Sequence, residues 1–503
     1  MLDGRAISPV ADARNRIAAR LLPLATLLIL TAFLAVTSAD ADLFGHLTFG
    51  RDIVRVHAVH ASDPYSFTSD RAWVNHEWLA EVIMWICYAL GGGVGLIVLK
   101  LSLGWAAGAL LLDAWRRYQL TPIQRDMLLF ATAFGAWPSL VTIRPQMFSV
   151  FLLAALLNVL GRFREGQIRV LPWLPVIFAA WVNLHGGWIV GASVLALFAA
   201  CSLVDPALVP SHRRLLFAAC AAAGLATLCN PYGARMLAFL VETVRPDRAD
   251  ITEWQPLTRL PAIALTLWLV PTAVALTAVS RHRGGLPLSS IAIAVMLAIA
   301  SFRVARIVSL YAVAVGFLLA PYAWSNVIAL TWPVRRTTRE WREAAVVYLL
   351  IVSVSVTLFG RRVAMDGSWL PEPEAAAFVS THRLHGNMFT WFDYGQYAIW
   401  HFWPAIRVSM DGRRETVFTE DLRAAHRRVY ANAPEALDVV GRLNPDYVWL
   451  PAKLPVVARL EAAGWVRLFR GSRSTILGRA GTTTAAATTT AMGPSQMRAF
   501  PGP

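Results

Sequence analysis

The stretch SADADLFGHLTFGRDI, Ser38–Ile53, decides how this chain is interpreted, because it begins where the long apolar run Leu21–Val36 has ended. It places Asp40, Asp42 and His46 within a few residues of an expected membrane surface. Charged and polar groups at such a depth are costly unless they have a partner or a role. The stretch therefore raises two linked questions, which are the membrane topology and the function.

A helix is predicted from Asp42 onward, lying at the membrane interface. Asp42 and His46 are one turn apart on its apolar side. That side also holds Leu43, Leu47, Gly50, Ile53 and Val54, and the opposite side holds Arg51, Asp52 and Arg55. Two interpretations of Asp40 and Asp42 stay open, an acidic cap of this helix or functional carboxylates. Their place beside His46 favours the second.

The composition is that of an integral membrane protein. Of the 503 residues, 56% are hydrophobic and only 15% are charged, and the mean hydropathy is +0.51, which is too apolar for an ordinary soluble domain. The net charge of +15 does not indicate a nucleic-acid partner. The arginines gather in short loops between apolar runs, which is the pattern of cytoplasmic loops.

The fold class predicted is an α-helical polytopic membrane protein of about eleven spans, with a small α/β domain near the C-terminus. The expected spans are 21–38, 93–114, 126–142, 146–162, 171–184, 187–204, 213–229, 259–279, 287–302, 305–325 and 342–360. Loop charges place residues 1–20 in the cytoplasm, and the loop 38–77 and everything after 360 outside. The location predicted is the plasma (inner) membrane, with many passes.

The domains expected are a membrane domain over 21–360, an extracytoplasmic α/β domain over 361–480 and a disordered tail over 481–503. The α/β domain is predicted from alternating helical and strand-like stretches such as GNMFTW, IRVSMDG and DYVWLP. The tail is predicted from its low-complexity Thr/Ala composition. A break in the chain is also expected at the glycines 91–93.

Polar residues of the membrane part gather at the expected outer ends of spans, where they are candidates for substrate binding. They are Arg144, Asn183, His185, Glu253, Arg303 and Arg306. Arg303 and Arg306 are three residues apart, so on a continuing helix both point to one side and suit a phosphate. The alternative for an arginine at a span end is snorkelling to lipid headgroups, and helix packing is the alternative for the NLHGGW segment around His185.

Together these segments resemble the GT-C superfamily of membrane glycosyltransferases. The resemblance covers residues 20–480 and rests on the Asp-x-Asp after the first span and on DPYS, NHEW, RPQ, NLHGG, WFDYGQYAIW and SMDGR. The resemblance is closer to a poorly characterised bacterial branch than to protein O-mannosyltransferases and aminoarabinose transferases. This chain has ADLFGH where aromatic pairs are usual, and the acids are kept.

The resemblance implies a polyprenyl-phosphate sugar donor and a lipid, glycan or protein acceptor. It makes Asp40 and Asp42 the catalytic base or ligands of a divalent metal (Mg or Mn), with His46 as a secondary candidate. It also places Asp63, Asn75, His76 and Glu77 among the substrate-binding residues. No glycine-rich loop of the nucleotide-binding type precedes a helix, so a nucleotide-sugar donor is not supported.

Two other classes of function remain. A lipid or polysaccharide transporter or flippase also places charges in a membrane cavity, but it often shows internal repeats and broken spans at mid-membrane, whereas these polar residues lie at one edge. A catalytically inactive GT-C-like scaffold is the third class.

Overall fold

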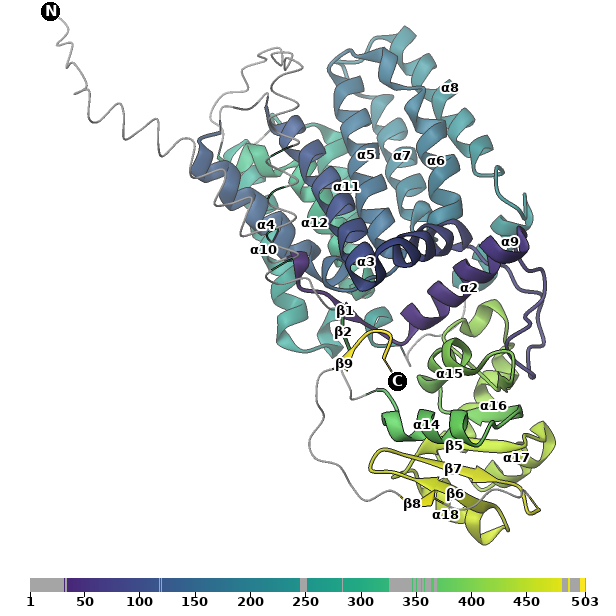
Figure 1. The fold of residues 1–503 in the computed structure, drawn as a ribbon. Coiled ribbons are helices and arrows are strands. Elements are labelled where there is room, and N and C mark those ends of the chain that lie inside the picture. The colour runs from purple at the N-terminus through teal and green to yellow at the C-terminus, as the bar shows by residue number, and fades with distance from the viewer. Residues whose placement is uncertain are drawn as a thin grey trace, which may run out of the picture. The chain divides into compact units, whose positions relative to one another are not determined.

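The chain divides by its internal contacts into two compact units. Unit 1 comprises Met1–Thr37, Ile97–Asn230 and Asp247–Arg361, and unit 2 comprises Ser38–Leu96, Pro231–Pro246 and Arg362–Pro503. The computed structural model describes residues 31, 34–116, 118, 120–244, 251–282, 284–324, 346, 350, 354, 357, 363–365, 369–481, 487–488 and 498–502 (Figure 1). The predicted outer loop 38–77 thus groups with residues after 361.

Unit 1 is helical, as its apolar runs predict. Its elements are α4 (Pro122–Val141), α5 (Gln146–Arg164), η1 (Ile168–Val170), α6 (Trp173–Leu184), α7 (Trp188–Ser202), α8 (Pro210–Ala226), η2 (Thr252–Trp254), η3 (Leu257–Arg259), α10 (Ala262–Arg281), α11 (Leu288–Arg303), η4 (Ala305–Ile307), α12 (Val308–Leu318) and η5 (Ala320–Ala323). Helices α5, α6, α7 and α8 pack side by side (Figure 1).

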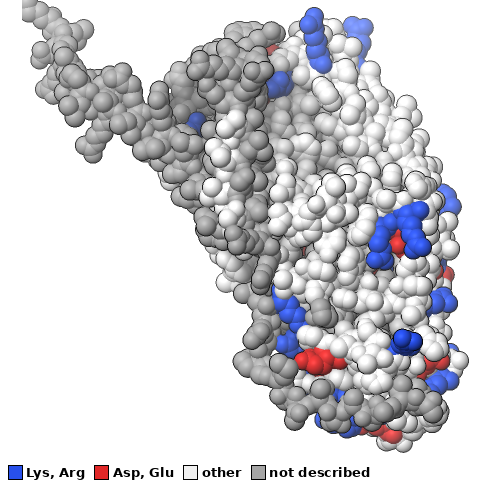
Figure 2. All heavy atoms as spheres, viewed as in Figure 1, with Lys and Arg blue, Asp and Glu red and all other residues white. Residues whose placement is uncertain are grey.

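Among the described residues, three helices are long and apolar enough to cross a membrane: α3 (Trp78–Trp115), α5 and α10. Four shorter apolar segments accompany them, Ile168–Leu184, Trp188–Ser202, Leu288–Arg303 and Ala305–Leu318. The visible surface over the helices of unit 1 is largely uncharged, with Lys and Arg at its upper end (Figure 2). The expected spans 21–38 and 342–360 lie largely outside the described residues, so the total of about eleven stays a prediction.

The expected break at residues 91–93 is confirmed. Helix α3 is interrupted at Gly92, whose φ of 56° and ψ of −143° are not helical. Only glycine adopts such a positive φ without steric strain. The helix therefore consists of two parts that meet at a kink.

Unit 2 is built on a six-stranded mixed sheet with the order β4-β3-β5-β7-β6-β8. Strands β4, β3 and β5 are parallel, and β7 runs antiparallel to both β5 and β6. The elements are β1 (Ser38–Ala39), α2 (Asp42–Val56), α9 (Arg235–Val244), β2 (Ala364–Met365), α14 (Pro373–Thr381), β3 (Gly386–Thr390), α15 (Tyr394–Phe402), β4 (Ile406–Val408), η6 (Arg414–Thr416), α16 (Glu420–Tyr430), α17 (Ala436–Leu443), β5 (Tyr447–Pro451), α18 (Pro455–Ala462), β6 (Val466–Arg470), β7 (Ser474–Gly478), β8 (Ala487–Thr488) and β9 (Arg498–Ala499).

The helix α2 forms where it is predicted, but its burial differs from the prediction. Asp52, expected on the exposed side, is only 2% exposed, and Val54, expected on the apolar side, is 38% exposed. The reason is Tyr65, whose hydroxyl donates to Asp52 Oδ2 over 2.7 Å. Leu43, Phe44, Leu47, Phe49 and Ile53 are also buried. The helix is therefore covered by protein around much of its circumference.

The Thr/Ala-rich tail contributes two short strands that its composition did not predict. Strand β8 pairs with β6, and β9 pairs with β2, which in turn pairs with β1. Next to β9, Phe500 is 7% exposed, and its ring lies 4.8 Å from that of Phe44. An apolar anchor of this size stabilises a short strand that has little pairing of its own.

The loop that carries Asp63 is attached to the edge of the sheet at β4. The amide of Phe67 donates to the carbonyl of Val408 over 3.1 Å, and the amide of Val408 donates to the carbonyl of Tyr65 over 3.1 Å. The guanidinium of Arg407 donates to the carbonyl of Ser66 over 2.9 Å. The loop thus supplies an added strand-like segment to β4.

A buried ion triad holds this loop in place. Arg413 donates through Nη1 to Asp63 Oδ1 (2.7 Å), through Nε to Asp411 Oδ1 (2.9 Å) and through Nη2 to Asp411 Oδ2 (2.6 Å). Burial alone lowers the pKa of Arg413, but the charges of Asp411 and Asp63 outweigh it and raise the pKa. The guanidinium also lies over the rings of Phe49, Tyr65 and Trp73, at 4.9, 5.2 and 4.8 Å from their centroids.

Replacement of Arg413 by methionine is expected to destabilise unit 2 strongly. It leaves two buried carboxylates, Asp63 and Asp411, without their cation, which costs about 3–5 kcal/mol. Thermal unfolding in detergent measures the loss. The matched control is Arg467→Met, because Arg467 is 42% exposed in its pair with Glu461 and such pairs contribute about 0–1 kcal/mol. Equal losses for the two variants would contradict a structural role for the triad.

Candidate functional site

The first candidate cluster lies at the start of α2, in unit 2. Asp40 Oδ1 accepts from the amide of Leu43 over 3.2 Å, which is a capping contact of the kind considered from the sequence. Asp42 lies in the first turn of the helix, and its Oδ1 is so close to Gly412 that a Cβ there would collide with it. Gln396 accepts from the amide of Gly45 over 3.2 Å. The GQY and MDG segments of the C-terminal part therefore pack directly on the predicted catalytic turn.

His46 is held by a network that the sequence did not predict. Its Nδ1 lies 3.2 Å from Glu81 Oε1, and Asn75 Nδ2 donates to Glu81 Oε2 over 2.6 Å. The Tyr232 hydroxyl in turn accepts from the amide of Asn75 over 2.8 Å. Glu81 is 3% exposed and is the acceptor shared by His46 and Asn75.

The network favours the protonated imidazole. Burial alone lowers the pKa of His46, but the hydrogen bond to Glu81 and the charges of Glu77, Glu81 and Asp42 outweigh it, so the pKa is raised above 6.5. His46 thus supplies a positive charge one helical turn from Asp42.

Three other residues that the resemblance placed in substrate binding lie in unit 2 with different surroundings. Asp63 belongs to the buried triad with Arg413, and its Oδ1 also accepts from the amide of Tyr65 over 2.8 Å. His76 Nε2 lies 3.5 Å from Glu77 Oε1, and both side chains are partly exposed. These contacts support a positioning role for Asp63, while substrate binding by His76 and Glu77 stays a prediction.

The second candidate cluster lies in unit 1 and is centred on Glu253. Arg144 Nη1 donates to Glu253 Oε2 over 3.0 Å, and Arg306 Nη1 donates to Glu253 Oε1 over 2.6 Å. Burial alone raises the pKa of Glu253, but the charges of Arg306 and Arg144 outweigh it and lower the pKa. The carboxylate is therefore ionised and holds two guanidinium groups.

Gln146, which the sequence did not single out, completes the contacts of Arg306. A guanidinium only donates, so the amide of Gln146 is oriented with its oxygen toward Arg306. In that orientation it accepts from Nη2 over 2.7 Å and from Nε over 2.5 Å. Gln146 is 8% exposed. It fixes the plane of the guanidinium beside Glu253.

His185 joins this cluster in a defined tautomer. Its Nδ1 lies 3.0 Å from the amide nitrogen of Gly187 and 2.6 Å from Ser149 Oγ. An amide N–H can only donate, so Nδ1 accepts and the ring proton is on Nε2. Nε2 lies 3.4 Å from Arg306 Nη2. An imidazole N–H and a guanidinium N–H are thus neighbours, an arrangement that suits an anionic acceptor between them.

Two of the predicted residues are not part of the Glu253 cluster. Asn183 Nδ2 donates to the carbonyls of Ala179 and Cys229, each over 2.8 Å, so it links α6 to the end of α8. Arg303 is exposed, and within the described residues it makes no hydrogen bond or ion pair. Arg303 and Arg306 do not share one continuing helix, because α11 ends at Arg303 and Val304 is extended, with φ −135° and ψ 100°.

Lys100 is a further buried polar residue that the sequence interpretation missed. It is 2% exposed, and its ammonium donates to the carbonyls of Val36 over 3.0 Å and Val141 over 3.5 Å. Cations favour carbonyls at the C-terminal ends of helices, and Val141 is the last residue of α4. The available signal was that Lys100 is the only charged residue between Glu81 and Asp113.

The described residues contain no group of three or more His, Cys, Asp or Glu side chains arranged to hold a metal ion. The assignment of Mg or Mn to Asp40 and Asp42 stays a prediction.

No protein-family model and no curated protein matches the chain. Among solved structures it resembles two cryo-EM classes of a mutant arabinofuranosyltransferase AftD from mycobacteria. One has 15% identity and a TM-score of 0.49 and covers 96% of this chain and 42% of that chain. The other has 13% identity and a TM-score of 0.48, with coverages of 95% and 42%. This chain thus spans less than half the length of either structure, and a likeness of this level does not define a function.

The raised pKa of His46 predicts a pH dependence of stability. The charged form is favoured in the folded state, so its contribution is fully present below pH 6.5 and is lost as the pH rises through the raised pKa. Glu81→Gln removes the hydrogen-bonded charge, so the stabilisation by His46 should be smaller and its loss should be complete at a lower pH. Thermal unfolding at a series of pH values measures this dependence for the wild-type chain and for Glu81→Gln. His46→Gln is the control and should abolish this pH-dependent loss of stability. A loss that persists in His46→Gln would show that another group causes it.

Proposed function

We propose that this chain is a membrane glycosyltransferase of the GT-C type, which transfers a sugar from a polyprenyl-phosphate donor to an acceptor at the outer face of the bacterial inner membrane. The observation that carries the proposal is the meeting of Arg144, His185, Glu253 and Arg306, which come from four separate stretches of sequence. Ionisable groups gathered at the ends of apolar helices are functional by default.

The Glu253 cluster is proposed to bind the phosphate of the donor. Glu253 and Gln146 fix the planes of two guanidinium groups, whose paired N–H donors match phosphate oxygens. His185 adds a neutral donor through Nε2, since its Nδ1 is an acceptor. Donors fixed in advance stabilise the charge that grows on a leaving phosphate.

The carboxylate at the start of α2 is proposed to act as the general base, and Asp42 is the stronger candidate because Asp40 caps the helix. The hydroxyl oxygen of the acceptor attacks the anomeric carbon of the sugar, and its proton passes to Asp42. The bond from that carbon to the phosphate oxygen breaks, and the electron pair stays on the polyprenyl phosphate. His46, one helical turn from Asp42, supplies a positive charge beside this proposed base.

Turnover with a panel of labelled polyprenyl-phosphate sugars tests the proposal. The wild-type chain is expected to transfer at least one sugar to a lipid, glycan or protein acceptor. Asp42→Asn should lower the rate by about 10²–10⁴-fold, as for loss of a general base, and the double change of Asp40 and Asp42 to alanine should abolish it. Asp70→Asn is the matched control in the same loop. Undiminished turnover in the double variant would reject the assignment, and movement of an intact donor across the membrane would indicate a flippase.

Lysine substitution separates phosphate recognition from snorkelling. Arg306→Lys keeps the charge but loses the paired donors, so donor affinity should fall by about 1–3 kcal/mol. Arg303→Lys is the matched control, because Arg303 is exposed at the end of α11 and should tolerate the change. Donor titration measures both affinities. Unchanged affinity in Arg306→Lys would remove the Glu253 cluster from donor binding.

A further inference from the structure

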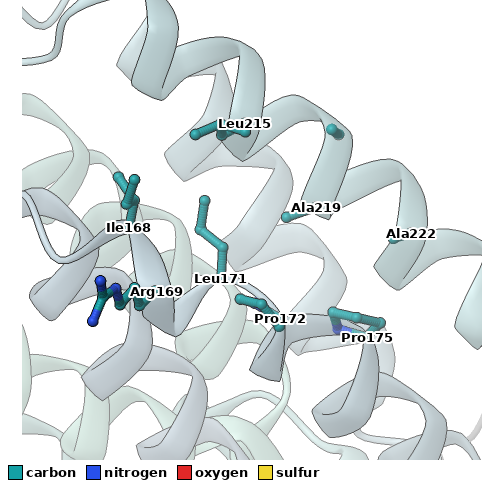
Figure 3. Close-up of a pocket in the computed structure, with 9 residues that line it drawn as sticks. Ile168, Arg169, Leu171, Pro172, Pro175, Leu215, Ala219 and Ala222 are labelled. Carbon is teal, nitrogen blue, oxygen red and sulfur yellow. The ribbon is translucent and has the colours of Figure 1, made fainter.

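An apolar groove lies between the start of α6 and one face of α8 in unit 1. Its volume is about 450 Å³, which falls within the range of ligand sites in proteins. It is lined by Ile168, Arg169, Leu171, Pro172, Pro175, Leu215, Ala218, Ala219 and Ala222. Figure 3 shows Leu171, Pro172 and Pro175 on one side and Leu215, Ala219 and Ala222 on the other.

The groove exists because small residues of α8 face it. Ala218, Ala219 and Ala222 recur at helical spacing, and their methyl groups leave unfilled the space that larger side chains would occupy. Apart from Arg169, the residues that line the groove have hydrocarbon side chains. Such a surface binds a flexible hydrocarbon chain and offers a polar ligand few hydrogen bonds.

Two arginines belong to the segments that line the groove, Arg169 to η1 and Arg214 to α8. Arg169 is one of the lining residues, and Arg214 directly precedes Leu215 on α8. Both side chains are exposed, and within the described part of the chain neither forms an ion pair. By contrast, the nearby Arg164 pairs with Asp205 over 3.2 Å. The segments that form the apolar groove therefore also carry two exposed cations that are accessible to a ligand.

We infer that this groove binds one anionic glycerophospholipid, with an acyl chain along the alanine face of α8 and the headgroup phosphate near Arg169 and Arg214. The loop charges place this end of the helices on the cytoplasmic side, where anionic lipids are concentrated and basic sites between spans bind their headgroups. His185 follows the other end of α6, roughly 18 Å away at 1.5 Å per residue. The lipid site is thus separate from the proposed donor cluster and does not depend on it.

Native mass spectrometry of the purified chain, exchanged into phosphatidylglycerol or phosphatidylcholine, tests the inference. The wild-type chain should retain one phosphatidylglycerol in preference to phosphatidylcholine. Ala219→Phe fills the groove and should abolish this retention. Ala221→Phe is the matched control, because Ala221 is exposed on the same helix and does not line the groove.

The headgroup contact is tested by the double variant Arg169→Gln, Arg214→Gln, which should lower the preference for phosphatidylglycerol by about tenfold. Arg281→Gln, at the end of α10, controls for a general loss of charge. Equal retention by Ala219→Phe and Ala221→Phe would overturn the inference, as would equal retention of the two lipids by the wild-type chain. Displacement of phosphatidylglycerol by a polyprenyl phosphate would assign the groove to the sugar donor instead.

Discussion

The contact on which the rest of unit 2 depends is the buried triad of Asp63, Arg413 and Asp411. Three charged groups are removed from water there, which is unfavourable unless each is paired and hydrogen-bonded. Arg413 meets that requirement with three hydrogen bonds and three aromatic rings. Because Asp63 belongs to the loop after α2 and Arg413 to the segment after β4, the triad fixes the loop on the sheet. The turn that carries Asp42 is packed against that same segment at Gly412.

Both candidate clusters follow one physical design, in which an acid, buried for Glu81 and half-buried for Glu253, organises groups that are themselves candidates for contact with substrate. In unit 2, Glu81 accepts from Asn75 and stabilises the charge of His46. In unit 1, Glu253 holds Arg144 and Arg306. A side chain fixed in this way loses little conformational freedom when a ligand arrives. Loss of either acid is therefore expected to lower substrate binding or turnover even if the acid itself does not contact a substrate.

Much of the fold follows from the sequence, because hydrophobic period and turn residues are local signals. The strands β3, β4 and β5 and the helices between them lie where the alternating pattern predicts. Convergence of His185 and Arg306 was also predictable, since both are polar groups at ends of apolar runs. Two tertiary contacts could not be predicted from the sequence, because each joins residues that no local pattern connects. They are the hydrogen bond from Tyr65 that accompanies the burial of Asp52 and the hydrogen bonds from Arg306 to Gln146. The break at Val304 agrees with the expected span limits, 302 and 305, and it separates Arg303 from Arg306.

Unit 2 is formed by three separate segments of the chain, so its folding must wait until the last of them has been synthesised. Asp63 leaves the ribosome 350 residues before its partner Arg413, and at about 5–20 residues per second the interval is roughly 20–70 s. During that interval the strand-like segment around Ser66 has no β4 edge to pair with, and the helices of unit 1 are being inserted. An unpaired strand segment is open to wrong partners. Elongation rate and chaperone access during this window are therefore expected to limit the yield of folded chain more than the final stability of unit 2 does.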